Sequence, residues 1–161
     1  GLAVAGAVAV DTQPAGASTP SATRAGIARA VLTRLNAERA SYRLPALRMN
    51  VHLISSAHSH NVAMAAYNTM SHQLPHEAYF TTRISRAGYR WSWAGENVAW
   101  NSVENQAGAL ALEGMMFNER APYNAHRLNI LSRRFTDIGI DIYIDARTQK
   151  LWMTEDFGRP A

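Results

Sequence analysis

An alternating run of isoleucines over residues 138–144 restricts the fold more than any other feature of the sequence. The run reads Ile138-Gly139-Ile140-Asp141-Ile142-Tyr143-Ile144. Successive side chains of a strand point to opposite faces, so this alternation predicts a β-strand. A polar turn over 145–150 and a returning strand over 151–157 are expected to follow. A further strand is expected over 91–100.

The earlier part of the chain has helical periodicity instead. Four helices are predicted, over about 23–40, from a cap at Asn50 through Tyr67, over 77–87, and from a cap at Ser102 to near Pro122. The last of them is expected to bury one face, formed by Val103, Ala107, Leu110, Gly114 and Phe117. Four helices covering a small antiparallel sheet make an α+β domain.

Length and charge limit the domain organisation and the class of partner. The 161 residues fit one domain, contain no cysteine and carry a net charge of +4. The arginines are scattered, so no nucleic-acid partner is expected. Residues 1–10 are apolar but shorter than the roughly 18 residues of a membrane span, and they resemble the end of a secretory signal or anchor. This segment and a flexible linker after it are expected to make up residues 1–20. The folded domain is expected over 21–161.

Histidines and carboxylates are the candidates for chemistry, because no phosphate-binding loop, zinc-protease or serine-hydrolase motif is present. His60 falls on the apolar face of the second helix, which predicts a hydrogen-bonded core histidine, whereas His52 and His58 should be exposed. Gly95 is expected to allow a sharp turn that aims Glu96. A carboxylate in such apolar surroundings needs a polar partner; the alternative is an exposed loop glutamate.

The sequence from about residue 32 to 158 resembles the CAP superfamily in its bacterial SCP-like form. The matching stretches occur in the family's order: 35–39, 44–47, Leu53 with Ala57, His60 and Met64, Ser71-His72, Arg83-Ile84, 87–89, 94–99, 126–131, 138–140 and 152–158. The resemblance implies a three-layer α-β-α sandwich. The disulfides of animal and plant members are missing here.

The same resemblance implies a cleft lined by two histidines and two acids. The matching positions are His72, Glu96, Glu119 and His126. Glu119 lies three residues after Met116, and the family usually has tryptophan at the position of Met116. Glu113 is the alternative acid. The family also has a glutamine before its final aromatic-glycine pair, whereas here Glu155-Asp156 precede Phe157. His72 and His126 are expected to bind a divalent metal, with zinc suited to neutral imidazoles.

The implied function is that of an exported bacterial CAP-domain protein that binds a metal and a lipid, sterol or cell-envelope component. Trp91, Trp93 and Trp100, with Tyr89, could line a ligand groove or belong to the core. One alternative is a metal-dependent hydrolase, acting on protein or envelope polymer, with Glu96 or Glu119 as general base. Another alternative is a structural or adhesive module of the envelope. The four cleft residues could also form a buried hydrogen-bonded network that only fixes the loops, with Arg127 in an ion pair.

Overall fold

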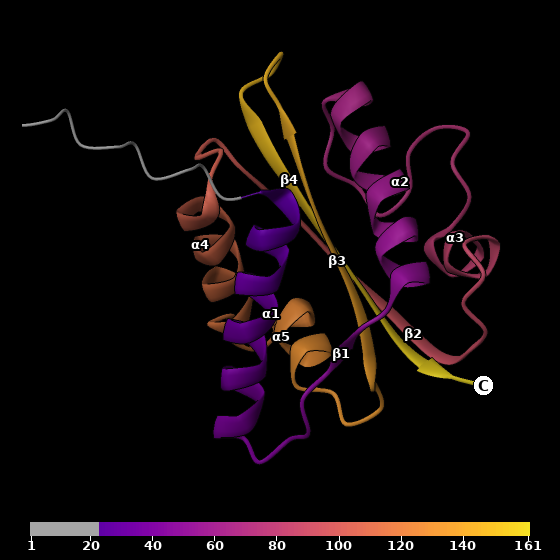
Figure 1. Ribbon diagram of the computed structural model, residues 1–161, viewed down its shortest axis with the longest axis vertical. Coiled ribbons are helices and arrows are strands. Elements are labelled where there is room, and N and C mark those ends of the chain that lie inside the picture. The colour runs from indigo at the N-terminus through magenta and orange to yellow at the C-terminus, as the bar shows by residue number, and fades with distance from the viewer. Residues whose placement is uncertain (1–22) are drawn as a thin grey trace, which may run out of the picture.

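A four-stranded sheet lies between two layers of helices in the computed structural model, which describes residues 23–161 (Figure 1). The helices α1 (Arg24–Ser41), α4 (Gln106–Phe117) and α5 (Ala125–Ile130) cover one face, and α2 (Val51–Tyr67) and α3 (Phe80–Arg86) cover the other. This confirms the expected α-β-α sandwich. The predicted leader and linker over 1–20 lie outside the described residues. Among residues 23–161, no helix is both long and apolar enough to cross a membrane.

The sheet has the strand order β1-β3-β4-β2. The predicted strands are confirmed as β2 (Trp91–Asn101), β3 (Asp137–Asp145) and β4 (Lys150–Pro160), which pair antiparallel. The two-residue strand β1 (Arg48–Met49) pairs parallel to β3 and makes the sheet mixed rather than purely antiparallel. It was not predicted, because two residues are too few to show a period.

Side-chain caps set the start of the two long helices. The hydroxyl of Thr23 accepts a hydrogen bond from the amide of Gly26 at the start of α1. The side chain of Asn50 accepts from the amides of His52 and Leu53, which confirms the predicted cap of α2. Helix α3 is shorter than predicted, and α5, with six residues, was not predicted.

Helix α4 differs from its prediction in start and orientation. Its cap is Asn105 rather than Ser102, because the Asn101 side chain accepts a hydrogen bond from the amide of Val103 and keeps that segment in a turn. The buried residues of the helix are Gly108, Ala109, Leu112, Glu113, Gly114 and Met116. Val103 and Ala107 are exposed, so the predicted apolar face was wrong over the first half of the helix.

The core divides according to the two faces of β3. Ile138, Ile140 and Ile142 pack with residues of α1, α4 and α5. On the opposite face Gly139 lets α2 come very close, since a Cβ there would lie 2.1 Å from the carbonyl carbon of Leu53. Any larger residue would therefore push α2 away from the sheet.

Candidate functional site

Glu96 lies in the middle of strand β2, and the predicted sharp turn at Gly95 was wrong. The strand continues through both residues, with Gly95 paired to Phe157 and Glu96 to Asp156. A glycine is needed here for space, because a Cβ would lie 2.9 Å from Cζ of Phe135 and 3.1 Å from Oδ1 of Asn129. The glycine therefore allows α5 and the segment after it to pack against the strand beside Glu96.

The carboxylate of Glu96 is buried and has two partners. Its side chain is 1 % exposed, and Oε1 accepts a hydrogen bond from Nδ1 of His72 at 2.8 Å. Oε2 accepts from Nη2 of Arg83. The same guanidinium donates through Nη1 to the carbonyl oxygens of His72, at 3.1 Å, and Ala78, at 2.9 Å. Arg83 therefore fixes both the acid and the loop that carries His72.

His60 supports the same loop from inside α2. It is fully buried, with Nδ1 2.7 Å from Oε1 of Glu77 and Nε2 2.8 Å from the carbonyl oxygen of Ser71. The predicted role as a hydrogen-bonded core histidine is confirmed. Both ring nitrogens of His60 face an oxygen atom. Two hydrogen bonds form if both nitrogens carry a proton, or if Nε2 carries one and the carboxyl group of Glu77 carries the other. The residue next to Ser71 is His72, whose ring is consequently held at the surface.

Asp156 is a buried acid opposite Glu96 that was noted from the sequence only as a departure from the family pattern. The two residues are opposite each other in neighbouring strands. Burial, followed by the negative charge of Glu96, raises the pKa of Asp156 well above its ordinary value. Both effects favour the protonated form of Asp156. The guanidinium of Arg83 forms its ion pairs with Glu96 and with Glu77, whose Oε1 lies 3.6 Å from Nε of Arg83.

A second histidine and acid meet at the start of α5. Nδ1 of His126 lies 2.5 Å from Oε1 of Glu119, and the backbone amide of His126 donates to Oε2 at 3.1 Å. The carboxylate thus fixes the orientation of the imidazole. Glu113, the alternative acid, is instead fully buried in α4 and forms no ion pair with His126.

An amide network joins the two pairs. The Asn97 side chain donates to the carbonyl oxygen of His126 at 3.3 Å and to Oε2 of Glu155 at 3.1 Å. The Asn129 side chain donates to Oδ1 of Asn97 at 2.8 Å and to the carbonyl oxygen of Glu96 at 3.3 Å. The predicted tetrad therefore belongs to one connected polar region, in which Asn97 and Asn129 had not been assigned a role.

Both imidazoles use the same nitrogen to hold a carboxylate. This leaves Nε2 of His72 and Nε2 of His126 without a hydrogen-bond partner among residues 23–161. Imidazoles oriented in this way by a carboxylate can bind a metal ion or transfer a proton. No three His, Asp or Glu side chains within residues 23–161 converge closely enough to hold one ion. Water or a bound ligand would have to complete any coordination shell.

The four predicted aromatic residues lie in four different environments. The indole of Trp91 donates to Oγ of Ser85 at 3.0 Å, and the ring of Trp93 lies under the guanidinium of Arg134 at 3.8 Å. Tyr89 is buried and donates to Asp137. Only Trp100 lines a groove close to the candidate site.

This groove is a cavity of about 300 Å³ between β2 and α4. Its apolar lining comes from Met70, Val98, Ala99, Trp100, Leu112, Met115 and Met116. Trp100, Met70 and Met115 are 41 %, 49 % and 67 % exposed, which is unusual for large apolar side chains gathered at one place. The Glu119–His126 pair also lines the cavity, so the apolar groove has a polar end.

Arg127 has a different role from the predicted ion pair. Its guanidinium donates to the carbonyl oxygen of Phe117 and to the hydroxyl of Tyr42, and no carboxylate of residues 23–161 pairs with it. It connects α5 to α1 and α4 by these two bonds and by stacking on both aromatic rings.

Comparison with known proteins identifies the family. A sequence model of the cysteine-rich secretory protein family, CAP, matches residues 32–157. The chain belongs to the CAP family. No curated protein matches the sequence significantly. The match covers both His–Glu pairs and the groove of this CAP domain.

Solved structures with the same fold come from several bacteria. An extracellular protein with an SCP domain from Bacillus anthracis has a TM-score of 0.71 and 26 % identity, over 84 % of this chain and 41 % of that one. An outer surface protein of Borrelia burgdorferi has a TM-score of 0.72 and 14 % identity, over 84 % and 93 %. A cysteine-rich secretory protein of Staphylococcus aureus has a TM-score of 0.62 and 15 % identity, over 86 % and 40 %. The CAP domain thus spans about two fifths of the Bacillus and Staphylococcus proteins.

Proposed function

We propose that this CAP domain is an exported binding module for a lipid-like ligand of the cell envelope. The apolar part of the ligand would lie in the groove at Trp100, and its polar part would meet the Glu119–His126 pair. The observation that carries the proposal is the gathering of exposed Trp100, Met70 and Met115 around a hollow with one polar end. Export is supported by the extracellular, outer-surface and secretory proteins that share the fold.

Binding is favoured over hydrolysis by the state of the two acids. Both oxygens of Glu96 already accept hydrogen bonds, and its side chain is 1 % exposed, so it is suited to hold His72 rather than to activate a substrate water. Glu119 is more accessible, but its carboxylate is bonded to the ring and backbone of His126. These contacts suit two positioned imidazoles at the end of a binding groove.

Replacing the aromatic wall of the groove tests the proposal. Trp100→Ala should weaken the binding of dihexanoyl phosphatidylcholine, titrated by calorimetry, by about tenfold or more, equivalent to about 1.4 kcal/mol. The matched control is Trp93→Ala, because Trp93 is also an exposed tryptophan of β2 but lies under Arg134 away from the groove lining. Equal affinity in the two variants, or no binding by the wild-type protein, would contradict the proposal.

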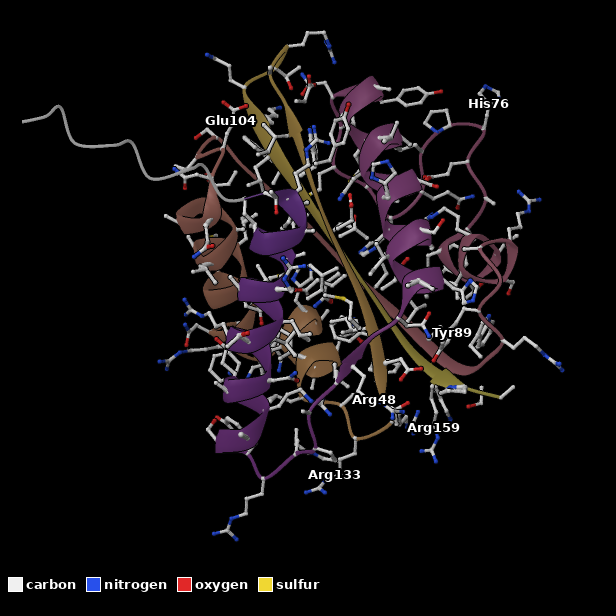
Figure 2. All side chains as sticks on the ribbon, viewed as in Figure 1. Arg48, His76, Tyr89, Glu104, Arg133 and Arg159 are labelled. Carbon is white, nitrogen blue, oxygen red and sulfur yellow. The ribbon has the colours of Figure 1, made fainter. Side chains whose placement is uncertain are left out.

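A divalent metal on His72 and His126 is a second proposal, supported by the free Nε2 atom of each carboxylate-held imidazole. We expect that His72→Ala and His126→Ala each reduce zinc affinity while the circular dichroism spectrum is unchanged. The control is His76→Asn: this histidine lies on the outer loop between α2 and α3 (Figure 2), and asparagine tolerates its positive φ of 64°. Zinc affinity that is the same in all three variants would exclude this site.

A further inference from the structure

A second cavity also reaches Glu119 but has a different chemical character. It has a volume of about 430 Å³, and its polar lining includes Arg120, Arg127, Tyr42, Asn118 and Asn124. No acid other than Glu119 lines it. The apolar groove at Trp100 shares Glu119 with this cavity, but it has no arginine in its lining.

Arg127 is held rigidly at this cavity. Its guanidinium carbon lies 4.6 Å from the ring centre of Phe117 and 5.3 Å from that of Tyr42. Of the five N–H donors of a guanidinium, only the two that reach Phe117 and Tyr42 have partners among residues 23–161. A planar cation fixed in this way loses little side-chain entropy when it binds an anion.

The cavity has an excess of positive charge. Neither Arg120 nor Arg127 forms an ion pair with another residue in 23–161. The negative charge of Glu119 is offset locally, since its carboxylate accepts hydrogen bonds from the ring and the amide of His126 and from the amide of Arg127. The side-chain amide of Asn124 adds a donor without a partner among the described residues.

We propose that this cavity binds a phosphate-type oxyanion. Two guanidinium groups, an amide donor and a hydroxyl are the groups that recognise phosphate oxygens in proteins. The anion could be free phosphate or the headgroup of an anionic lipid. The site does not depend on the proposed lipid groove, although an anionic lipid could occupy both cavities because both reach Glu119.

Inorganic phosphate is the first probe of this site. Calorimetry should detect phosphate binding by the wild-type protein, weaker at high salt because the charges are screened. Arg120→Glu should reduce the affinity by tenfold or more. Arg159→Glu makes the same change in charge at an exposed arginine near the C-terminus (Figure 2) and should leave the affinity unchanged. Failure of the wild-type protein to bind phosphate, or equal loss in both variants, would overturn the proposal.

Arg127→Lys is the second test, because it keeps the charge and removes the planar fork. It should weaken phosphate binding, and a melting curve measured in parallel shows whether the domain remains folded. If Arg127→Lys unfolds the domain, Arg120→Glu decides, since Arg120 is exposed and its side chain forms no ion pair within residues 23–161.

Two short-chain lipids separate this inference from the groove proposal. Arg120→Glu should reduce binding of dihexanoyl phosphatidylglycerol but not of the zwitterionic phosphatidylcholine, whereas Trp100→Ala should reduce both. If phosphate binds and neither lipid does, the anion is free phosphate and only the groove proposal fails. If both lipids bind and Arg120→Glu changes neither, the groove proposal stands, a lipid headgroup is excluded as the anion, and the phosphate titration alone decides the anion site.

Discussion

Glu96 is buried inside the domain between two hydrogen-bond donors, Arg83 and His72. An ionised carboxylate without such partners would be strongly destabilising in the interior. Asp156 lies directly opposite, and burial and the charge of Glu96 raise its pKa well above the ordinary value. The surroundings of these two acids thus depend on residues that are neighbours in space and not in sequence.

A second set of buried acids lies in the other helical layer. Glu113 of α4 and Glu155 of β4 are both fully buried, and Glu38 of α1 is their neighbour. Burial, followed by the charge of Glu155, raises the pKa of Glu113 to about 12, and burial also raises the pKa of Glu155. Neither oxygen of Glu113 has a donor among residues 23–161. As a neutral acid it can itself donate to a neighbouring carboxyl group.

This raised pKa predicts how stability depends on pH. The unfolded chain releases the Glu113 proton above about pH 4.5, whereas the folded domain keeps it to about pH 12. The contribution of Glu113 is therefore fully present below pH 4.5 and decreases as pH rises, by at most about 1.4 kcal/mol per pH unit. The free energy of unfolding, measured by urea denaturation, should fall less from about pH 6 to about pH 9 in Glu113→Gln than in the wild-type protein. Parallel pH profiles would contradict the assignment of a neutral Glu113.

Among the elements, those with a clear period were predicted correctly. Strand β3 alternates between an isoleucine face toward α1, α4 and α5 and a second face toward α2 with Gly139, Asp141 and Tyr143, and its limits follow from that pattern. Helix α4 was predicted with the wrong face because Ala and Gly on several sides blur its apolar stripe, and because Glu113 is buried. The elements β1 and α5 are too short to show any period.

The candidate site was predicted in part. The residues His72, Glu96, Glu119 and His126 were chosen through the family resemblance, and the structure brings them together as two bonded pairs. Arg83 and Asp156 were not predicted as neighbours of Glu96. Helix α3 brings Arg83 to Glu96 and the register of β2 with β4 brings Asp156, and the spacing of residues in the sequence encodes neither arrangement. Trp91 and Trp93 could not be separated from Trp100, because all three share one strand and only packing shows which lines the groove.

At the scale of the whole molecule, the site lies at one edge of the sheet. Strand β2 is the last strand in the order β1-β3-β4-β2, so residues of both helical layers can meet there. His72 comes from the loop after α2, Glu119 from the loop after α4, and His126 from the start of α5 (Figure 1). A groove at this edge needs no gap in the core, which explains how a well-packed domain can offer an apolar binding surface.

The methionine methyl groups provide the most direct measurement of binding in this groove. Of the six methionines, Met70, Met115 and Met116 line the groove, whereas Met49, Met64 and Met153 lie elsewhere. In NMR spectra of protein labelled with ¹³C at these methyl groups, dihexanoyl phosphatidylcholine should shift the first three resonances and leave the other three unchanged. The proposal is contradicted if none of the three groove resonances shifts, or if Met49, which lines a separate cavity with Ile54, shifts in their place.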